Sequence, residues 1–264
     1  MVANRSRSPV TILLVSFVSV LVLGLVFRHL EKALDRQYLP KQLCHAAGEK
    51  AIQVVVAVRT SPNNYDTRQA IRSSMASPAV RALLPWQVVF YMGHSLDRKT
   101  FSRAPTGGSQ GRHHHHPLRN TTSGNTVKCF LHAIRWVHER CEPNLRYLIH
   151  TNDSTMVDLV AAYEYIWNMS GGNRYFYCSP VSNVPVDRDA NSPTYLSETQ
   201  FSKPHFSTFC EGDAFIVPAE LLKTLVKVSQ AIAQYPLLGP YVTGDLARVA
   251  EVGHRNISTK VGLW

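Results

Sequence analysis

The sequence is short of charged residues and contains no Cys-x-x-Cys pair, no internal repeat and no dense run of lysine or arginine. Only 17% of its 264 residues are charged and 45% are apolar, so we expect a globular chain with a sizeable core, in one large domain or two small ones. Because the basic residues are scattered, nucleic-acid binding is not predicted. The absence of Cys-x-x-Cys argues against a common type of zinc site. The net charge of +10 favours anionic partners, such as nucleotides, phosphosugars, acidic glycans or lipid headgroups.

The amino-terminal region contains one uncharged apolar run, residues 10–27, which is close to the shortest helix that can cross a bilayer. A cleaved signal peptide is the alternative, but the run is long for one and no Ala-x-Ala-like site follows it. We therefore expect a retained transmembrane helix, preceded by a cytoplasmic tail at residues 1–9 and followed by a stem at 28–50 and a lumenal domain at 51–264. Basic residues flank the run on both sides, so the positive-inside rule barely decides its orientation.

Cysteines and glycosylation sequons also point to a lumenal domain. The chain has five cysteines, which predicts disulfides with one leftover thiol. Acceptor sequons at Asn120, Asn168 and Asn256 predict N-glycosylation. A further formal match at Asn152 is expected to be idle, because it falls in the candidate site described below.

The hydrophobic pattern predicts alternating strands and helices. The apolar, β-branched runs at 53–58 and 87–92 are typical of buried parallel strands. An apolar stripe at helical spacing marks residues 127–139 as a helix, and residues 147–149 and 175–181 read as further strands. Residues 209–218 are expected to form a turn and a short strand, and residues 219–234 a helix. Strands that alternate with helices indicate an α/β fold with a mostly parallel central sheet.

Residues 94–124 interrupt this pattern with glycines, Pro117 and four consecutive histidines, His113 to His116. Such a composition buries little apolar surface, so we expect a long solvated loop. Metal binding by the histidine tract, centred in the stretch 107–117, is the alternative.

Candidate site residues lie where the predicted strands end. The strand at 147–149 leads into Asn152-Asp153-Ser154. A carboxylate at the carboxyl end of a strand lies where open α/β sheets bind ligands, and Asp153 could hold a divalent cation against a diphosphate. The alternative is an ordinary turn, because these residue types bond readily to their own backbone.

The first predicted strand ends at Thr60 and Ser61, and a helix with Arg68 and Arg72 on one face follows. Arg68 could offset diphosphate charge with its forked donors. The alternative is that both arginines only solvate a helix face.

Several segments in chain order resemble the β-1,3-galactosyltransferase-like glycosyltransferases of Golgi membranes. The first strand and the following Arg-Gln-Ala-Ile-Arg look like that family's first strand and its Arg-x-x-Ile-Arg-x-Thr-Trp motif. The stretch 147–158 is similar to Tyr-x-x-Lys-Thr-Asp-Asp-Asp-x-Phe-Val-Asn. Further matches are Val88 to Gly93, Lys128 with Arg135-Trp136-Val137 and Cys141, Tyr195-Leu196-Ser197, Phe206 to Gly212 and Tyr241-Val242-Thr243-Gly244.

The resemblance implies a GT-A-like nucleotide-sugar fold in a single-pass type II protein of the Golgi membrane. It implies a UDP-sugar donor, Mn²⁺, and a glycan acceptor on a glycoprotein or glycolipid. UDP is then expected near Thr60, Ser61, Arg68 and Arg72, and Asp153 is expected to be the metal contact and a catalytic residue.

The departures from the family pattern fall on the chemistry. Asn152 and Ser154 replace the outer carboxylates of the Asp triplet, and neutral oxygens hold a divalent cation less well. The family's Glu-Asp, which supplies the general base, maps onto Leu238 and Gly239, which cannot accept a proton. Asp245 is the nearest carboxylate and the second candidate catalytic residue.

Two hypotheses follow from the sequence. The first is a hexosyltransferase that transfers galactose or N-acetylglucosamine from a UDP-sugar to a glycan hydroxyl. The second is a catalytically weak or inactive family member that binds glycans or partner proteins in the secretory pathway.

Overall fold

The computed structural model describes residues 21–26, 52–92, 112–115, 126–141, 144–155, 157–168 and 174–257. The chain divides into two units, residues 1–43 and 44–264. In the first unit, residues 21–26 are helical, and within the described ranges we find no helix with the length and apolar character needed to cross a membrane. The rest of the expected anchor at 10–27, the tail at 1–9 and the stem at 28–50 lie outside the described residues.

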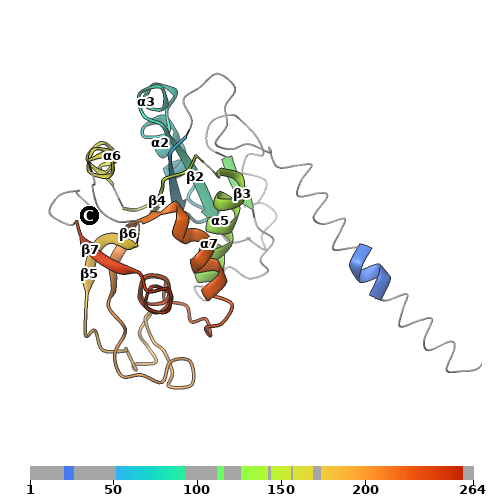
Figure 1. Cartoon of the computed structure of the whole chain (residues 1–264), viewed down its shortest axis with the longest axis vertical. Coiled ribbons are helices and arrows are strands. Elements are labelled where there is room, and N and C mark those ends of the chain that lie inside the picture. Colours follow the sequence, from blue (N-terminus) through green and yellow to red (C-terminus); the bar gives the residue numbers. More distant parts are fainter. Residues whose placement is uncertain are drawn as a thin grey trace, which may run out of the picture. The chain divides into compact units, whose positions relative to one another are not determined.

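The second unit is built on a seven-stranded sheet with the order β3-β2-β1-β4-β6-β5-β7 (Figure 1). The strands are β1 (Val54–Arg59), β2 (Trp86–Met92), β3 (Arg112–His115), β4 (Tyr147–Asn152), β5 (Tyr175–Val181), β6 (Phe209–Pro218) and β7 (Gly253–Asn256). Strands β3, β2, β1 and β4 are parallel neighbours, and β5 is parallel to β7. Strand β6 runs antiparallel to both β4 and β5. The predicted α/β fold with a mostly parallel sheet is therefore confirmed.

Helices cover both faces of the sheet (Figure 1). They are α2 (Tyr65–Ser73), α3 (Pro78–Leu83), α5 (Thr126–Cys141), α6 (Leu159–Trp167), α7 (Ala219–Val228), the π-helix η2 (Gly239–Leu246) and α8 (Ala247–Val249). Local sequence explains where two of them begin. Ser77 caps α3 by accepting a hydrogen bond from the Val80 amide, with Pro78 at the first helical position. The Asp158 carboxylate caps α6 by accepting from the amides of residues 160 and 161.

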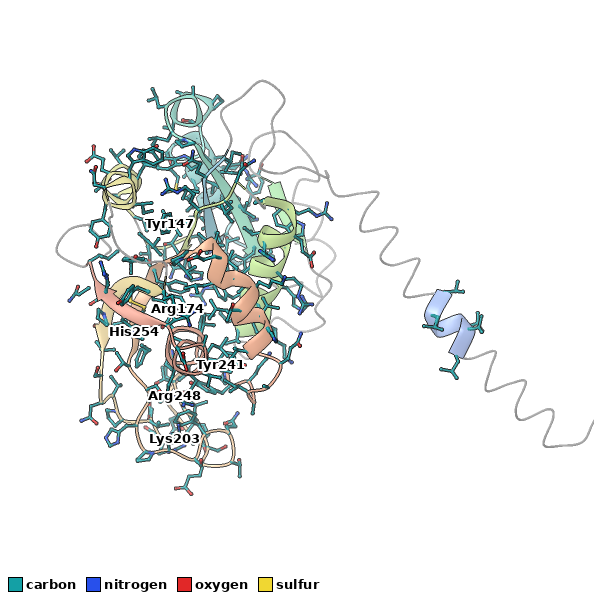
Figure 2. All side chains as sticks on the ribbon, in the orientation of Figure 1. Tyr147, Arg174, Lys203, Tyr241, Arg248 and His254 are labelled. Carbon is teal, nitrogen blue, oxygen red and sulfur yellow. A yellow bond between two sulfur atoms is a disulfide. The ribbon has the colours of Figure 1, made fainter. Side chains whose placement is uncertain are left out.

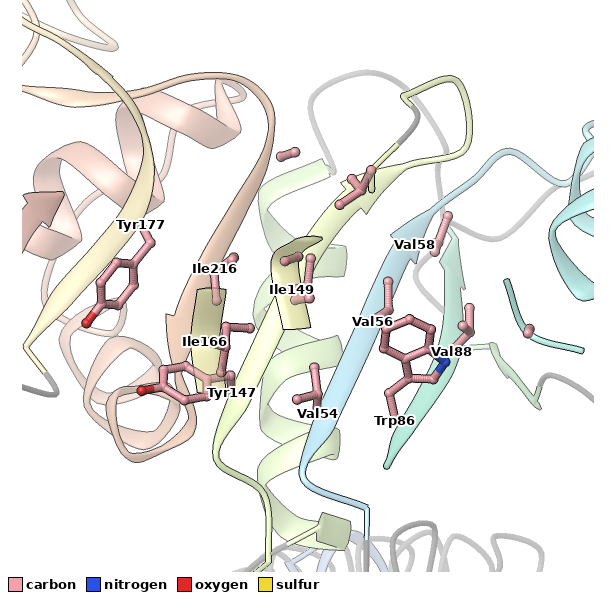
Figure 3. Close-up of a cluster of buried hydrophobic side chains, with 14 of the residues drawn as sticks. Val54, Val56, Val58, Trp86, Val88, Tyr147, Ile149, Ile166, Tyr177 and Ile216 are labelled. Carbon is pink, nitrogen blue, oxygen red and sulfur yellow. The ribbon is translucent and has the colours of Figure 1, made fainter. Parts of the chain in front are cut away.

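One apolar cluster fills the face of the sheet that α2, α3 and α6 cover. Val54, Val56 and Val58 point to this face from alternate positions of β1, as Figure 3 shows. Ile149 from β4 and Ile166 from α6 pack in the same cluster. Helices α5 and α7 contact each other and pack against β1, β2 and β6. Because both faces of the sheet are covered, the inner strands β1 and β2 are almost continuously apolar, which is why the sequence predicted them as buried strands.

The structure corrects three details of the sequence interpretation. The loop expected over 94–124 contains β3, which pairs with β2; an edge strand offers unpaired backbone groups, and a neighbouring segment can satisfy them whatever its side chains are. Residues 209–218, expected to form a turn and a short strand, form the single strand β6. The helix expected at 219–234 ends at residue 228.

Candidate functional site

Three chain segments meet at the carboxyl ends of β1 and β4. The two strands run in parallel register, so that Arg59 lies beside Asn152. The amide of Asp153 donates to the Arg59 carbonyl at 2.9 Å, and the amide of Thr60 donates to the Tyr91 carbonyl at 3.1 Å. This backbone pairing places the loop that follows β1 against the turn that follows β4.

Asp153 is the centre of this meeting point. Its Oδ2 accepts hydrogen bonds from Thr60 Oγ1 at 2.5 Å and from Asn64 Nδ2 at 2.8 Å. Its Oδ1 makes no hydrogen bond within the described part of the chain. The side chain is half-buried, so one carboxylate oxygen is fixed by the protein and the other is available to a ligand. The sequence analysis placed Thr60 and Asp153 in the same site, and the two side chains are in contact. It did not predict the contact between Asn64 and Asp153, because nothing in the loop sequence indicates it.

Arg68 supports the loop from beneath rather than facing solvent. Its side chain has no exposed surface. It donates to the carbonyl of Ser61, to the carbonyl of Pro62 at 3.0 Å and to Thr60 Oγ1 at 3.3 Å. Burial lowers the pKa of Arg68, the charge of Arg72 lowers it further, and the charge of Asp153 opposes both effects. Thr60, Ser61, Arg68 and Asp153 therefore form one connected group, with Arg68 holding the loop in shape.

Arg72 lies one helical turn further along α2 and points elsewhere. Its guanidinium donates to Gln69 at 2.8 Å and lies over the Phe90 ring, 5.1 Å from the ring centroid. No hydrogen bond links it to Asp153 within the described residues.

Asn152 and Ser154 form a closed turn. Asn152 Oδ1 accepts from both the amide and the hydroxyl of Ser154, each at 3.0 Å. Asn152 Nδ2 donates to Asp213 Oδ2 at 2.6 Å, and Arg59 donates to Asp213 Oδ1 at 3.3 Å. Asp213 is a carboxylate of the site that the sequence interpretation missed. It comes from β6, about sixty residues later, and only the antiparallel pairing of β6 with β4 brings it here.

His150 lies beneath this group, fully buried in β4. Its Nδ1 is 3.0 Å from the carbonyl oxygen of Asp213, which can only accept, so Nδ1 carries the proton. Its Nε2, 2.6 Å from the Tyr91 hydroxyl, therefore accepts from that hydroxyl. Burial raises the pKa of Tyr91 well above its usual value, which keeps this donor protonated. The imidazole thus ties β2, β4 and β6 together.

Burial lowers the pKa of His150 to about 3, the positive charge of Arg59 contributes in the same direction, and the bond to the Asp213 backbone partly opposes them. His150 is consequently neutral at physiological pH, and both of its ring nitrogens are engaged, by the Tyr91 hydroxyl and the Asp213 carbonyl. It stacks on the Phe215 ring at a centroid distance of 4.6 Å.

Asp245, the second candidate catalytic residue, lies in η2 and is 6% exposed. Its two oxygens accept from Ser207 at 2.9 Å and from Tyr235 at 3.1 Å, and Arg248 lies 4.0 Å away. Tyr241 and Arg248, on either side of it in the sequence, are labelled in Figure 2. Its charge, after burial, is the second cause that raises the pKa of Tyr241 to about 12. No hydrogen bond within the described residues joins Asp245 to the group around Asp153. The contacts of Asp245 with Ser207, Tyr235 and Arg248 indicate a structural role.

Gly239 is one of the two positions onto which the resemblance maps the family's Glu-Asp. A Cβ there would come within 3.0 Å of the Cys210 carbonyl oxygen and 3.4 Å of the Phe209 ring. The start of η2 therefore packs closely on β6, and a larger side chain at this position would require the β6 backbone or the Phe209 ring to shift.

The cysteines and the sequon asparagines can be compared with the predictions of disulfides and N-glycosylation. Cys178 and Cys210 form a disulfide between β5 and β6, and Cys129 is a half-buried free thiol. Of the sequon asparagines, Asn168 and Asn256 are exposed, and Asn120 lies outside the described residues. The fourth, Asn152, is 7% exposed and hydrogen-bonded through both side-chain atoms, as given above.

The residues of the site fit a divalent cation poorly. Across the described ranges we find no group of three or more His, Cys, Asp or Glu side chains able to hold a metal ion. Asp153 contributes one open oxygen, and Asp213 is occupied by Arg59 and Asn152. A Mg²⁺-like ion prefers six oxygen ligands, carboxylates and phosphates above all, so this donor set would leave most of the coordination shell to ligand and water.

A cavity of about 160 Å³ lies elsewhere, between α5 and the segment that follows α7. Lys128 and Arg135 line it on one side, and Ser229, Gln230 and Gln234 on the other. It shares no lining residue with the group around Asp153.

Comparison with known proteins identifies the family. The family model described as Galactosyltransferase matches residues 116–258, more than half of the sequence, and the chain belongs to this family. The matched region contains Asp153 and β4 through β7. The resemblance found in the motifs is thereby confirmed.

Individual relatives are distant. The chain is 22% identical to the human acetylgalactosaminyl-O-glycosyl-glycoprotein beta-1,3-N-acetylglucosaminyltransferase, over 80% of this chain and 57% of that protein. It is 23% identical to the lactosylceramide 1,3-N-acetyl-beta-D-glucosaminyltransferase A of Danio rerio, over 69% of this chain and 50% of that protein. The chain thus spans about half the length of the curated relatives it matches.

Among solved structures, one similar chain is titled as the crystal structure of galactosyltransferase LgtC in complex with donor and acceptor sugar analogues. The identity is 10%, the alignment covers 80% of this chain and 71% of that chain, and the TM-score is 0.35. A likeness at this level supports no conclusion about this chain.

Proposed function

We propose that this protein is a glycosyltransferase that binds a UDP-hexose, galactose or N-acetylglucosamine being the candidate sugars, and transfers it to a glycan hydroxyl on a glycoprotein or glycolipid. The observation that carries the proposal is the group around Asp153. It lies at the carboxyl ends of parallel strands β1 and β4, where α/β sheets bind ligands, and Asp153 falls within the family match.

The residues of the group suit the donor better than the acceptor. Thr60 and Asn64 hold Asp153 in one orientation, and such fixed polar groups favour a single pose of a bound ligand. Hydroxyl, amide and guanidinium donors at the same edge can hydrogen-bond to a diphosphate. In glycosyl transfer the diphosphate is the leaving group, so donors placed there stabilise the charge that develops on it.

The step that these residues support least is deprotonation of the acceptor hydroxyl. Leu238 and Gly239 cannot accept a proton, and Asp245 is enclosed by Ser207 and Tyr235. A general base typically contributes about 10² to 10⁴ in rate. We therefore expect slow transfer. The missing base also favours the second candidate function, in which the protein binds a sugar nucleotide or glycan without turning it over.

A donor assay tests the proposal. The full chain is incubated with UDP-galactose or UDP-N-acetylglucosamine, with and without a panel of glycan acceptors, and UDP release is measured. We expect slow, acceptor-stimulated release, and we expect Asp153→Asn to lower it by about tenfold or more, since Thr60 and Asn64 would no longer donate to a charged carboxylate and the loop after β1 would lose its charge-assisted anchor.

The matched control is Asp158→Asn. Asp158 is five residues away and caps α6, and asparagine is an equally good cap, so this variant should keep the wild-type rate. Equal rates for Asp153→Asn and the wild type would show that the site lies elsewhere. Donor binding without any turnover would select the binding-only function.

A further inference from the structure

We propose that Arg59, rather than a divalent cation, neutralises the diphosphate of the donor at this site. The inference rests on the proposed function, which supplies a nucleoside diphosphate sugar as the ligand. It differs from the Mn²⁺ dependence that the family resemblance implies, and it follows from how the polar atoms at the strand ends are already engaged.

Almost every oxygen that could hold a cation has a protein partner. Asn152 Oδ1 accepts two hydrogen bonds from Ser154. Asp153 Oδ2 accepts two, from Thr60 and Asn64. Of the carboxylate oxygens of Asp153 and Asp213, only Asp153 Oδ1 makes no hydrogen bond in the described part of the chain. A divalent cation would gain one carboxylate ligand here and would have to displace Arg59 to gain a second.

The same edge of the sheet holds a cation of its own. Arg59 is the last residue of β1, and its side chain is 35% exposed. Its only hydrogen bond in the described residues goes to Asp213 at 3.3 Å, and the Asp213 side chain is 47% exposed. Four of the five guanidinium N–H donors are therefore available. Exposed ion pairs of this kind are weak, so Arg59 can turn to a phosphate.

Arg59 is also the arginine with the geometry for this role. Both terminal nitrogens of Arg68 are engaged by the loop it supports, and its side chain is fully buried. Arg72 is engaged by Gln69 and lies over Phe90. A guanidinium matches phosphate oxygens with two parallel hydrogen bonds, which is the contact that a metal-free diphosphate site requires.

Calorimetric titration of UDP into the full chain tests the inference, once with MnCl₂ and once with EDTA. We expect the same affinity in both, within about threefold, and we expect Arg59→Ala to weaken UDP binding about 10- to 100-fold in both. Arg59→Lys keeps the charge but loses the forked guanidinium, so its affinity for UDP should lie between those of the wild type and Arg59→Ala. Arg135→Ala is the control, because Arg135 lies on α5 among the residues that line the separate cavity.

Asp213→Asn separates the two explanations most sharply. Without a metal, this change removes a negative charge beside the diphosphate and frees Arg59, so UDP should bind as tightly as before or more tightly. If a cation mediates binding, the same change removes a ligand and UDP should bind more weakly. Mn²⁺ binding is followed independently by the electron paramagnetic resonance signal of free Mn²⁺, which the protein should leave unchanged in the presence of UDP.

The outcomes distinguish this inference from the proposed function. UDP binding that needs Mn²⁺ and survives Arg59→Ala would overturn the inference and leave the proposed function intact. No UDP binding under either condition would overturn both.

Discussion

Acidification from pH 6.5 to pH 3 is expected to lower the free energy of unfolding by about 3 to 5 kcal/mol through His150 alone, because its pKa in the folded protein is about 3. An unfolded histidine titrates near its ordinary value of 6.5. The imidazole is fully buried against the rings of Phe130 and Phe215. Tyr91 and the Asp213 carbonyl occupy both nitrogens of the neutral form.

The direction follows from which state binds the proton. Between pH 6.5 and 3 the unfolded chain is protonated at this position and the folded protein is not, so the proton favours unfolding and stability decreases as the pH falls. Above pH 6.5 neither state is protonated and the contribution is constant. Below pH 3 both are protonated, and no further loss arises from this residue.

Urea denaturation of the full chain at a series of pH values measures the effect, with His150→Asn as the control. Asparagine can still donate to the Asp213 carbonyl but does not titrate. The variant should be less stable at pH 7 and should lose less stability than the wild type on acidification. Parallel pH profiles for the two proteins, or an NMR titration of His150 with a midpoint near 6.5, would contradict the assignment.

Arg68→Ala is expected to lower the free energy of unfolding by about 3 to 5 kcal/mol. The change leaves a cavity beneath the loop and removes the donors that satisfy the Ser61 and Pro62 carbonyls. Because the same loop carries Thr60 and Asn64, which orient Asp153, UDP affinity should fall as well.

Arg72→Ala provides the matched comparison one turn away on α2. Arg72 is only half-buried, and its contacts with Gln69 and the Phe90 ring are those of a partly solvated side chain. Its removal should cost about 1 kcal/mol. The two variants are compared by urea denaturation. A loss for Arg68→Ala no larger than that for Arg72→Ala would contradict the structural role given to Arg68.

The sequence predicted those parts of the fold and site that depend on neighbours along the chain. The β-branched runs gave β1 and β2 to within one residue at either end, because strands buried on both faces need continuous apolar residues. Parallel strands end at the same edge, so Thr60 and Asp153 could be expected to meet. The helical pattern likewise placed Arg68 and Arg72 on the same helix.

Features that depend on pairing between distant segments could not be predicted. Asp213 reaches Asn152 only because β6 inserts antiparallel between β4 and β5, and nothing near it in the sequence records this. The sequence also could not show that Arg68 is buried and Arg72 is only half-buried. This difference between successive turns of α2 depends on the loop that packs over the helix. His150 lies just after the predicted strand 147–149, and its hydrogen bond to Tyr91 in β2 spans the intervening strand β1.

Hydrogen–deuterium exchange of the full chain with and without UDP tests the central claim most directly, namely that the nucleotide binds at the carboxyl ends of β1 and β4. UDP should slow amide exchange in residues 60–64 and 153–155, where the ligand would contact the loop supported by Arg68 and the turn that carries Asp153. The cavity between α5 and the segment after α7 is the internal control, and exchange in residues 128–135 and 229–234 should not change. Protection confined to residues 128–135 and 229–234, or no protection at residues 60–64 and 153–155 at saturating UDP, would contradict the account.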